Sequence, residues 1–169
     1  SLSKLRDMLG FVPQKGVLFS GTIASNIKFG DENISDEDMY KAAEIAQALE
    51  FIEGKEDKFD SEISQGGSNV SGGQKQRLSI ARALAKNPKI LLFDDSFSAL
   101  DYKTDVTLRK TLREKMQDTT TIIVAQRIAT ILNADKIIVM NEGKVVGIGK
   151  HQELLKTCPT YLEIAESQL

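Results

Sequence analysis

The sequence lacks several features that mark whole classes of protein. A single cysteine, Cys158, excludes an internal disulfide framework and is typical of a reducing compartment. With 22 basic and 24 acidic residues, the formal net charge is −2, so the basic excess expected of a nucleic-acid binder is missing. No apolar run approaches the roughly 18–20 residues that cross a bilayer, and Ser1–Lys4 opens no hydrophobic signal segment. We therefore expect any membrane association to come from a partner or from a segment outside these 169 residues.

The composition that is present, 41% hydrophobic and 27% charged, is ordinary for one globular domain or a large piece of one. Apolar periodicity predicts strands alternating with helices, which favours an α/β fold around a parallel sheet. The expected strands cover residues 9–12, 90–93 and 120–125, with a hairpin over 135–140 and 144–148. The expected helices cover residues 21–30 in part, 35–49, 71–86, 102–116, 153–156 and 161–166. Residues 60–70 are expected to form a loop, and the helix-rich stretch of about 21–86 is expected to be an inserted subdomain.

The strongest motif is Val70-Ser71-Gly72-Gly73-Gln74-Lys75-Gln76-Arg77. Ser71 and Gln74 have the spacing of a capping box, which predicts that a helix begins here. Two glycines in a first turn cost roughly 1 kcal/mol each relative to alanine, so they indicate a close backbone approach. A helix end with free amides and a serine hydroxyl suits a terminal phosphate. An ordinary glycine-containing helix cap would give the same local pattern.

The second motif is the run Lys89–Phe93 followed by Asp94 and Asp95. A buried strand that ends in carboxylates delivers charge to the edge where α/β sheets bind ligands. Asp94 is suited to hold Mg²⁺, through water, because hard cations take oxygen ligands. Two acids that merely end a strand and begin a turn are the simpler alternative.

The order and spacing of these segments resemble the ATP-binding-cassette (ABC) family, and the resemblance covers essentially all 169 residues. Ser71–Gln74 matches its signature motif, Ile90–Asp94 its Walker B strand, and Ser98–Asp101 its D-loop. Val12-Pro13-Gln14 matches the Q-loop, while 18–27 and the tail 149–155 with Tyr161 resemble exporter cassettes. The resemblance implies a P-loop NTPase-like cassette, with about 15–86 forming the Q-loop and helical subdomain. The Walker B core, D-loop, switch loop and C-terminal helices would then occupy about 87–169.

The resemblance also implies residue roles, cofactors and partners. Two cassettes of the family, alike or different, sandwich two ATP molecules with Mg²⁺, and transmembrane domains on the same chain carry the substrate. Ser71, Gly72, Gly73 and Gln74 would contact ATP held by the partner cassette. Gln14 would approach the Mg²⁺ and the attacking water, and Ser98 and Asp101 would lie at the dimer interface. The expected location is the cytoplasmic face of the cell membrane, within an integral transporter.

Three departures from the family pattern bear on catalysis. First, no Gly-x-x-x-x-Gly-Lys-[Ser/Thr] loop occurs among these residues, so we expect this chain alone to bind ATP weakly and not to hydrolyse it. We interpret the sequence as the C-terminal part of a cassette rather than as a natural loss of that loop. Second, Asp95 stands where the general-base glutamate is usual. A carboxylate one methylene shorter retreats by about 1 Å, which can cost about 100-fold in rate, unless a small local shift restores its reach.

The third departure is Gln126, which falls at the family's switch-loop histidine. Glutamine can donate a hydrogen bond to a γ-phosphate but carries neither a proton nor a positive charge. The single histidine, His151, matches the tail pattern and is expected to be a surface or capping residue. Asp95 and Gln126 degrade the same site while the signature helix stays complete, which predicts the degenerate half of a heterodimeric exporter.

Two other functions and one structural consequence remain open at this level. A soluble member of the superfamily would be expected to lack the 18–23 segment and the 149–155 tail, and a non-hydrolysing regulatory module would dimerise without turnover. Without the strand that precedes the phosphate loop, we expect unpaired strand edges near 90–93 and 120–124, and therefore either self-association or a strand packing that differs from a whole cassette. The identity of the transported substrate lies in transmembrane helices that these residues do not include.

Overall fold

The computed structural model describes residues 1–168 and divides the chain into two compact units, 1–124 and 125–169. The first unit begins with a short helix, α1 (Leu2–Met8), and contains the sheet together with the larger of two hydrophobic cores. The second unit has its own smaller core. Each unit is described by itself.

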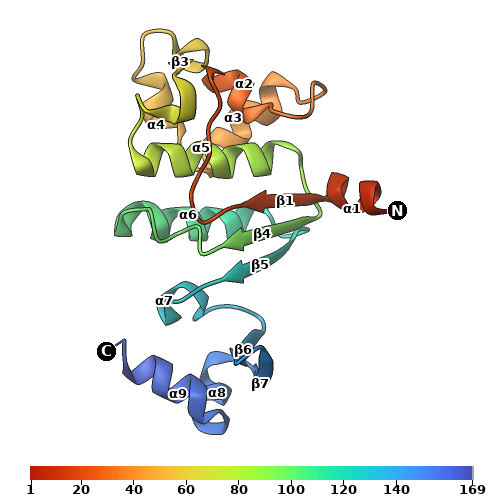
Figure 1. Cartoon of the computed structure of the whole chain (residues 1–169), viewed down its shortest axis with the longest axis vertical. Coiled ribbons are helices and arrows are strands. Elements are labelled where there is room, and N and C mark those ends of the chain that lie inside the picture. The colour runs from red at the N-terminus through yellow and green to blue at the C-terminus, as the bar shows by residue number, and fades with distance from the viewer. Residues whose placement is uncertain (169) are drawn as a thin grey trace. The chain divides into compact units, whose positions relative to one another are not determined.

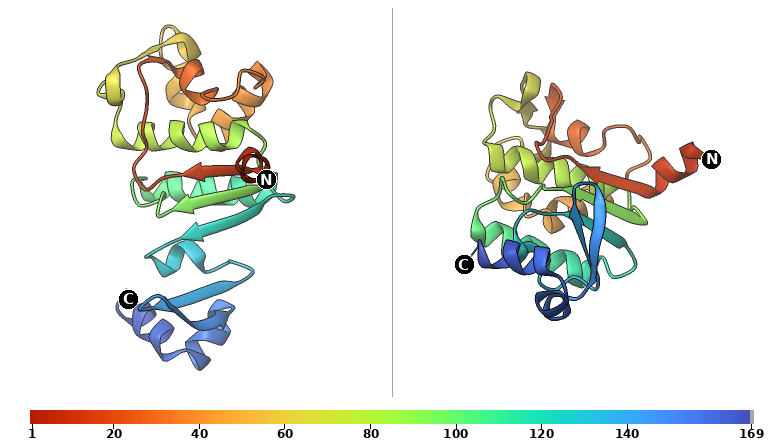
Figure 2. Two further views of the ribbon diagram at one scale, coloured as in Figure 1. Left: turned by 45° about the vertical axis from the view of Figure 1, so that its right-hand side comes forward. Right: turned by 60° about the horizontal axis from the view of Figure 1, so that its bottom comes forward.

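The sheet of the first unit has three parallel strands, and they run side by side in Figures 1 and 2. They are β1 (Leu9–Val12), β4 (Ile90–Asp94) and β5 (Thr120–Val124), in the order β1-β4-β5. The register pairs Phe11 with Leu92 and Leu92 with Ile122. The three strand predictions are confirmed. The predicted unpaired edge at 90–93 is wrong, because β1 satisfies one side of β4 and β5 the other.

Burial differs between the two faces of this sheet. Val12, Leu91 and Phe93 are fully buried and point toward the helices that cover one face. On the other face Phe11 and Ile122, which flank Leu92, are about half exposed at 50% and 49%. The expectation that β4 is buried on both faces therefore holds for one face only, since Leu92 is of intermediate burial.

Two long helices flank the sheet and set the positions of the motifs. Helix α5 (Gly72–Ala85) contacts β1, and α6 (Tyr102–Lys115) follows β4 along the chain (Figure 1). Helix α3 (Asp36–Ile45) packs against both of them. The core between these helices contains apolar side chains of α5 at helical spacing, such as Ile80 and Leu84. Both long helices lie where the sequence predicts them.

The helix-rich stretch contains more short elements than the sequence predicts. The expected helix at 35–49 ends at Ile45, because Gln47 adopts a left-handed backbone (φ 58°) and a second helix, α4 (Leu49–Glu53), begins after it. The expected loop at 60–70 contributes β3 (Glu62–Ile63), which pairs with β2 (Gly21–Thr22). The remaining elements are α2 (Ile23–Ile27) and the 3₁₀ turns η1 (Lys58–Asp60) and η2 (Gln65–Gly67).

The second unit is a hairpin with three helices: α7 (Ile128–Ile131), β6 (Ile137–Asn141), β7 (Lys144–Gly149), α8 (His151–Thr157) and α9 (Pro159–Glu166). Glu142 and Gly143 both have positive φ, which suits the two-residue turn of the predicted hairpin. His151 lies at the start of α8, and its Nδ1 is 2.8 Å from the hydroxyl of the buried Tyr161. Among residues 1–168, no helix is both long and apolar enough to span a bilayer.

Candidate functional site

Gln14, Asp94 and Asp95 lie at the carboxyl edge of the parallel sheet. Asp94 ends β4 and is exposed, Asp95 follows it, and Gln14 lies two residues beyond β1. Because parallel neighbours end at the same edge, the sheet brings the three together. The Gln14 amide (Nε2) donates a hydrogen bond to Asp95 Oδ2 at 3.2 Å. This pair spans 81 positions of sequence, so the fold brings together two of the residues that the sequence predicts for one site.

The backbone of Asp95 is fixed as firmly as its side chain. Its φ is 46°, in the left-handed region that aspartate tolerates better than most residues. Its N–H donates to the carbonyl of Val124 at the end of β5, at 2.9 Å, and Ser98 Oγ donates to its carbonyl, also at 2.9 Å. The carboxylate therefore leaves the sheet edge from a backbone that is held on both sides.

The predicted capping box begins α5. Ser71 Oγ accepts a hydrogen bond from the Gln74 amide N–H at 3.2 Å, and the Ser71 N–H donates to Gln74 Oε1 at 3.1 Å. Ser71 and Gly72 are exposed. A methyl group placed on Gly72 would meet no atom within 4 Å. The end of the helix is therefore open, with its first amides accessible to an anion.

Asp101 is the N-cap residue of α6, and it lies close enough to Arg77 of α5 to feel its positive charge. It accepts hydrogen bonds from Thr104 Oγ1 at 2.6 Å and from the Thr104 N–H at 3.0 Å. These bonds, with the positive charge of Arg77 as a smaller cause, hold the pKa of Asp101 below its usual value. Burial in turn lowers the pKa of the Arg77 guanidinium, which donates to the carbonyls of Gly73 and Gln47. The signature segment and the D-loop segment of this chain are thus neighbours.

Two buried polar residues near the site escape the sequence analysis. Ser96, fully buried, donates its hydroxyl to the carbonyl of Val12 at 2.7 Å. Gln76, 1% exposed, bonds the carbonyl of Pro13 and the N–H of Gly16. The available signal for Gln76 was its place on the apolar face of α5, since Ile80 lies four positions further on and is fully buried.

Gln126 lies in the second unit, in the exposed segment between β5 and α7. Its carbonyl accepts a hydrogen bond from Gln168 Nε2 at 2.7 Å, and Gln168 Oε1 accepts from the N–H of Ile128 at 2.8 Å. The C-terminal glutamine therefore fixes the backbone around Gln126. The role of Gln126 at a nucleotide stays a prediction.

The chemistry of the sheet edge fits a hard divalent cation. Asp94 offers a carboxylate and Gln14 an amide oxygen, and both are exposed. Within residues 1–168, no group of three or more His, Cys, Asp or Glu side chains is arranged to hold a metal without other ligands. Mg²⁺ is commonly bound by one or two carboxylates together with substrate phosphates and water, so these residues suit it as part of a nucleotide complex.

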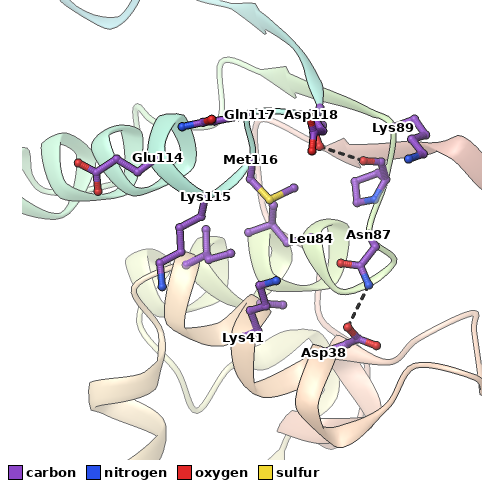
Figure 3. A pocket seen from close by; sticks show the side chains of 14 residues that line it. Asp38, Lys41, Leu84, Asn87, Lys89, Glu114, Lys115, Met116, Gln117 and Asp118 are labelled. Atoms are coloured by element: carbon purple, nitrogen blue, oxygen red, sulfur yellow. Dashed lines mark hydrogen bonds between the residues drawn. The ribbon is translucent and has the colours of Figure 1, made fainter.

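A cavity of about 370 Å³ lies at the opposite end of β4 from Asp94. It is lined by the ends of α5 and α6 and by one side of α3, from Asp38 to Ile45 (Figure 3). Asn87 Nδ2 donates to Asp38 Oδ1 across its wall at 3.0 Å. Three lysines and three acidic residues line it, so its charge favours no ligand of one sign. The candidate site is therefore the carboxyl edge of the sheet together with the first turn of α5.

Comparisons with known proteins agree on one family. The model of the family described as "ABC transporter" matches residues 1–98. An uncharacterized ABC transporter ATP-binding protein of Mycobacterium tuberculosis is 45% identical over 98% of this chain and 28% of its own length. A multidrug resistance ABC transporter ATP-binding and permease protein of Lactococcus lactis is 39% identical over 100% of this chain and 29% of its own. An ATP-dependent lipid A-core flippase of Desulfotalea psychrophila is 43% identical over 91% and 27%.

A solved structure extends the likeness to the fold. A bacterial Atm1-family ABC exporter with ATP bound superposes with a TM-score of 0.94 at 39% identity, over 99% of this chain and 29% of that one. This confirms the predicted fold class, a parallel-sheet α/β cassette of the P-loop NTPase type. The chain spans less than a third of the length of each of these relatives.

Proposed function

Because the chain belongs to the ABC transporter family, we propose that it is the C-terminal part of the ATP-binding cassette of a membrane exporter. The exporter would couple ATP binding and hydrolysis to the export of a substrate. The cassette would act at the cytoplasmic face of the membrane, joined to transmembrane domains and paired with a second cassette. The multidrug and lipid A-core transporters among the relatives support an exporter, and they leave the substrate class open.

We further propose that the two ends of this site serve different ATP molecules. The first turn of α5 would close on the nucleotide of the partner cassette, and the Asp94 edge would belong to the chain's own nucleotide. The observation that carries this is the open end of α5. Ser71 caps the helix, Gly72 has free space around it, and the exposed amides favour a phosphate.

The chain's own site would bind ATP but turn it over slowly. Asp95 is one methylene shorter than a glutamate. Hydrogen bonds to Val124 and Ser98 hold its backbone, and the Gln14 amide donates a hydrogen bond to its carboxylate. A carboxylate so fixed has little freedom to move about 1 Å toward a water. Gln126 would donate a hydrogen bond to the γ-phosphate without carrying positive charge. The partner's site, completed by an intact Ser71–Gln74 segment, would do most of the hydrolysis.

Asp94 and Gln14 would hold Mg²⁺ at the chain's own site. The ion supplies charge neutralisation for the β- and γ-phosphates when bound. The residues of this chain orient the nucleotide and the water. Since no phosphate-cradling loop occurs among the 169 residues, we propose that the chain alone neither binds ATP tightly nor hydrolyses it.

The test is steady-state ATPase activity of the full-length subunit, alone and with its partner cassette. We expect slow turnover alone, fast turnover together, and a loss of roughly 100-fold on Ser71→Ala in this subunit, as for a lost transition-state hydrogen-bond donor. Fast turnover by the lone subunit, or no loss on Ser71→Ala in the complex, contradicts the proposal. Dimerisation driven by ATP without any turnover would indicate a regulatory module instead.

A further inference from the structure

The Q-loop, here residues 13–16, lies directly on the signature helix α5, and one buried side chain joins them. Gln76 Nε2 donates to the carbonyl of Pro13 at 3.1 Å, and Gln76 Oε1 accepts from the N–H of Gly16 at 2.7 Å. Gln76 is 1% exposed, so both of its polar ends are paired away from water. The amide therefore holds both ends of the loop against one turn of helix.

Gly16 shows how close the contact is. A methyl group on Gly16 would lie 2.9 Å from the carbonyl oxygen of Lys75 and 3.0 Å from Gln76 Oε1. Both distances are shorter than an ordinary van der Waals contact, so only glycine fits while the loop stays on the helix.

The other side of the Q-loop is tied to the sheet edge. Ser96 Oγ donates to the carbonyl of Val12, just before the loop, and the Gln14 side chain donates to Asp95. The loop thus has one set of bonds to the residues of the chain's own nucleotide site and another to the helix whose first turn is Ser71–Gln74. Four positions of helix separate Gln76 from Gly72, which is about one turn.

We propose that Gln76 is a positioning residue that couples the two ATP sites of the transporter. This inference rests on the proposed function, in which Gln14 serves the chain's own ATP site and Ser71 serves the partner's ATP site. When a ligand binds at Asp94 and Asp95 and displaces the Q-loop, Gln76 moves with the loop and shifts α5. The first turn of α5 then moves toward or away from the partner's nucleotide.

The energetics favour a rigid connection over a loose one. A buried amide with both ends paired offsets its desolvation, whereas breaking either bond leaves a backbone group and a side-chain group unsatisfied. The loop and the helix are therefore expected to move together rather than to separate. A connection of this kind produces coupling that can be measured as non-additivity.

The experiment uses the full-length subunit paired with its partner cassette. Gln76→Met keeps the length of the side chain and removes both hydrogen bonds. We expect kcat to fall roughly ten- to 100-fold, because a small misplacement of the signature turn is costly. We expect KM for ATP to change less than about twofold, because Gln76 does not touch the nucleotide.

A double-mutant cycle separates coupling from general damage. Gln14→Ala alone should reduce turnover at the partner's site. The double variant Gln14→Ala/Gln76→Met should show no lower turnover than Gln76→Met alone. Asn26→Leu is the matched control, because Asn26 is also 1% exposed and its amide bonds both the N–H and the carbonyl of Phe19. We expect Asn26→Leu to lower thermal stability while its effect on turnover stays independent of Gln14→Ala.

Gly16→Ala tests the same contact from the loop side and serves if Gln76→Met does not fold. It should reproduce the loss of kcat and should not add to Gln76→Met or to Gln14→Ala. The coupling proposal is wrong if the effects of these substitutions simply multiply, or if Asn26→Leu behaves like Gln76→Met. The proposed function itself fails separately, through the Ser71→Ala test, whatever the outcome of the cycle.

Discussion

Asp95 joins the sheet to two neighbouring segments through a backbone conformation that few side chains adopt readily. Its φ of 46° places it in the left-handed region, which short polar side chains tolerate. The Val124 carbonyl and the Ser98 hydroxyl fix its peptide groups, and Gln14 fixes its carboxylate. If Asp95 acts as the general base, as we propose, both its side-chain length and its backbone would limit its reach toward a water.

We expect Asp95→Glu to restore hydrolysis at the chain's own site in part, because the added methylene returns about 1 Å of reach, worth up to roughly 100-fold. The backbone should resist a longer side chain, at a cost of about 1 kcal/mol in the free energy of unfolding. Single-turnover hydrolysis, measured in the paired complex with the partner's site inactivated, gives the gain. Asp95→Asn is the control and should give none, and an equal gain from it would contradict a general-base role.

A second residue-scale prediction concerns acid stability. Hydrogen bonds from Asn87 (Figure 3), then from Ser35, hold the pKa of Asp38 below its ordinary 3.8. A lowered folded pKa stabilises the fold above the unfolded pKa, and this contribution is lost as pH falls through the folded pKa. Asn87→Gly keeps the left-handed backbone at this position (φ 48°) and removes the amide. NMR titration should then show the pKa of Asp38 rising, and stability should depend less on pH below about 4.

Lys28→Ala is the control for this titration. It removes the ion pair with Asp36, in the first turn of α3, without touching the Asn87 contact. The pKa of Asp38 should stay where it is in the unsubstituted chain. An equal rise in both variants would mean that the general charge of α3, and not the Asn87 hydrogen bond, sets this pKa.

At the scale of elements, α5 combines a capping motif that the sequence shows with long-range contacts whose partners the sequence does not indicate. The Ser71 capping box was predictable, because its donors and acceptors lie within three positions of one another. The bonds of Gln76 to Pro13 and Gly16 span 60 positions or more, and only the folded sheet brings these residues together. Likewise the break at Gln47 within the predicted helix 35–49 has no glycine or proline to mark it.

The fold class and the strand positions were predictable for a related reason. Continuous apolar runs such as Ile90–Phe93 are long enough to stand out in the sequence, whereas β2 and β3 have two residues each and do not. The gathering of Gln14, Asp94 and Asp95 was predictable from the family resemblance and from the rule that parallel strands end at one edge. The hydrogen bond between Gln14 and Asp95 was not, since its geometry depends on the turn after each strand.

The first turn of α5 gives an element-scale prediction. Gly72→Ala should raise the free energy of unfolding by up to about 1 kcal/mol, because alanine is the better helix former and the added methyl meets nothing within 4 Å. The same methyl would obstruct a phosphate, so turnover at the partner's site should fall. Gly54→Ala, at the end of α4, is the control, since its backbone is helical (φ −73°) and the residue lies outside the site. Chemical denaturation and ATPase assays on both variants give the two values.

If Gly72→Ala stabilised the chain and left turnover of the paired complex intact, the close approach of a phosphate to this turn would be wrong. A loss of turnover in Gly54→Ala of the same size would also contradict it, because the effect would then come from helix stability alone. The pair of glycines therefore separates binding from folding within one measurement series.

At the scale of the whole molecule, the three-stranded sheet leaves one apolar face exposed and has two edge strands, β1 and β5. Phe11, Ile122 and Val124 are 50%, 49% and 51% exposed, and within residues 1–168 β5 pairs with β4 alone. Contiguous apolar surface and an unpaired strand edge both favour association with another chain. The pairing of β4 on both sides removes one of the two edges that the sequence predicts, so β5 is the predicted edge that remains, and β1 forms the other edge of the sheet.

We therefore expect the 169-residue chain to self-associate through this face and the β5 edge. Light scattering after size exclusion should give a mass above 18.6 kDa that rises with concentration. Ile122→Lys places a charge on the open face and should shift the chain toward monomer, because burying an unpaired ammonium is costly. Tyr102→Ser, at an 83% exposed residue of α6, removes a larger apolar group elsewhere and should leave association unchanged. A compact monomer at all concentrations would contradict association through the sheet, and equal effects of both substitutions would assign it to general surface hydrophobicity.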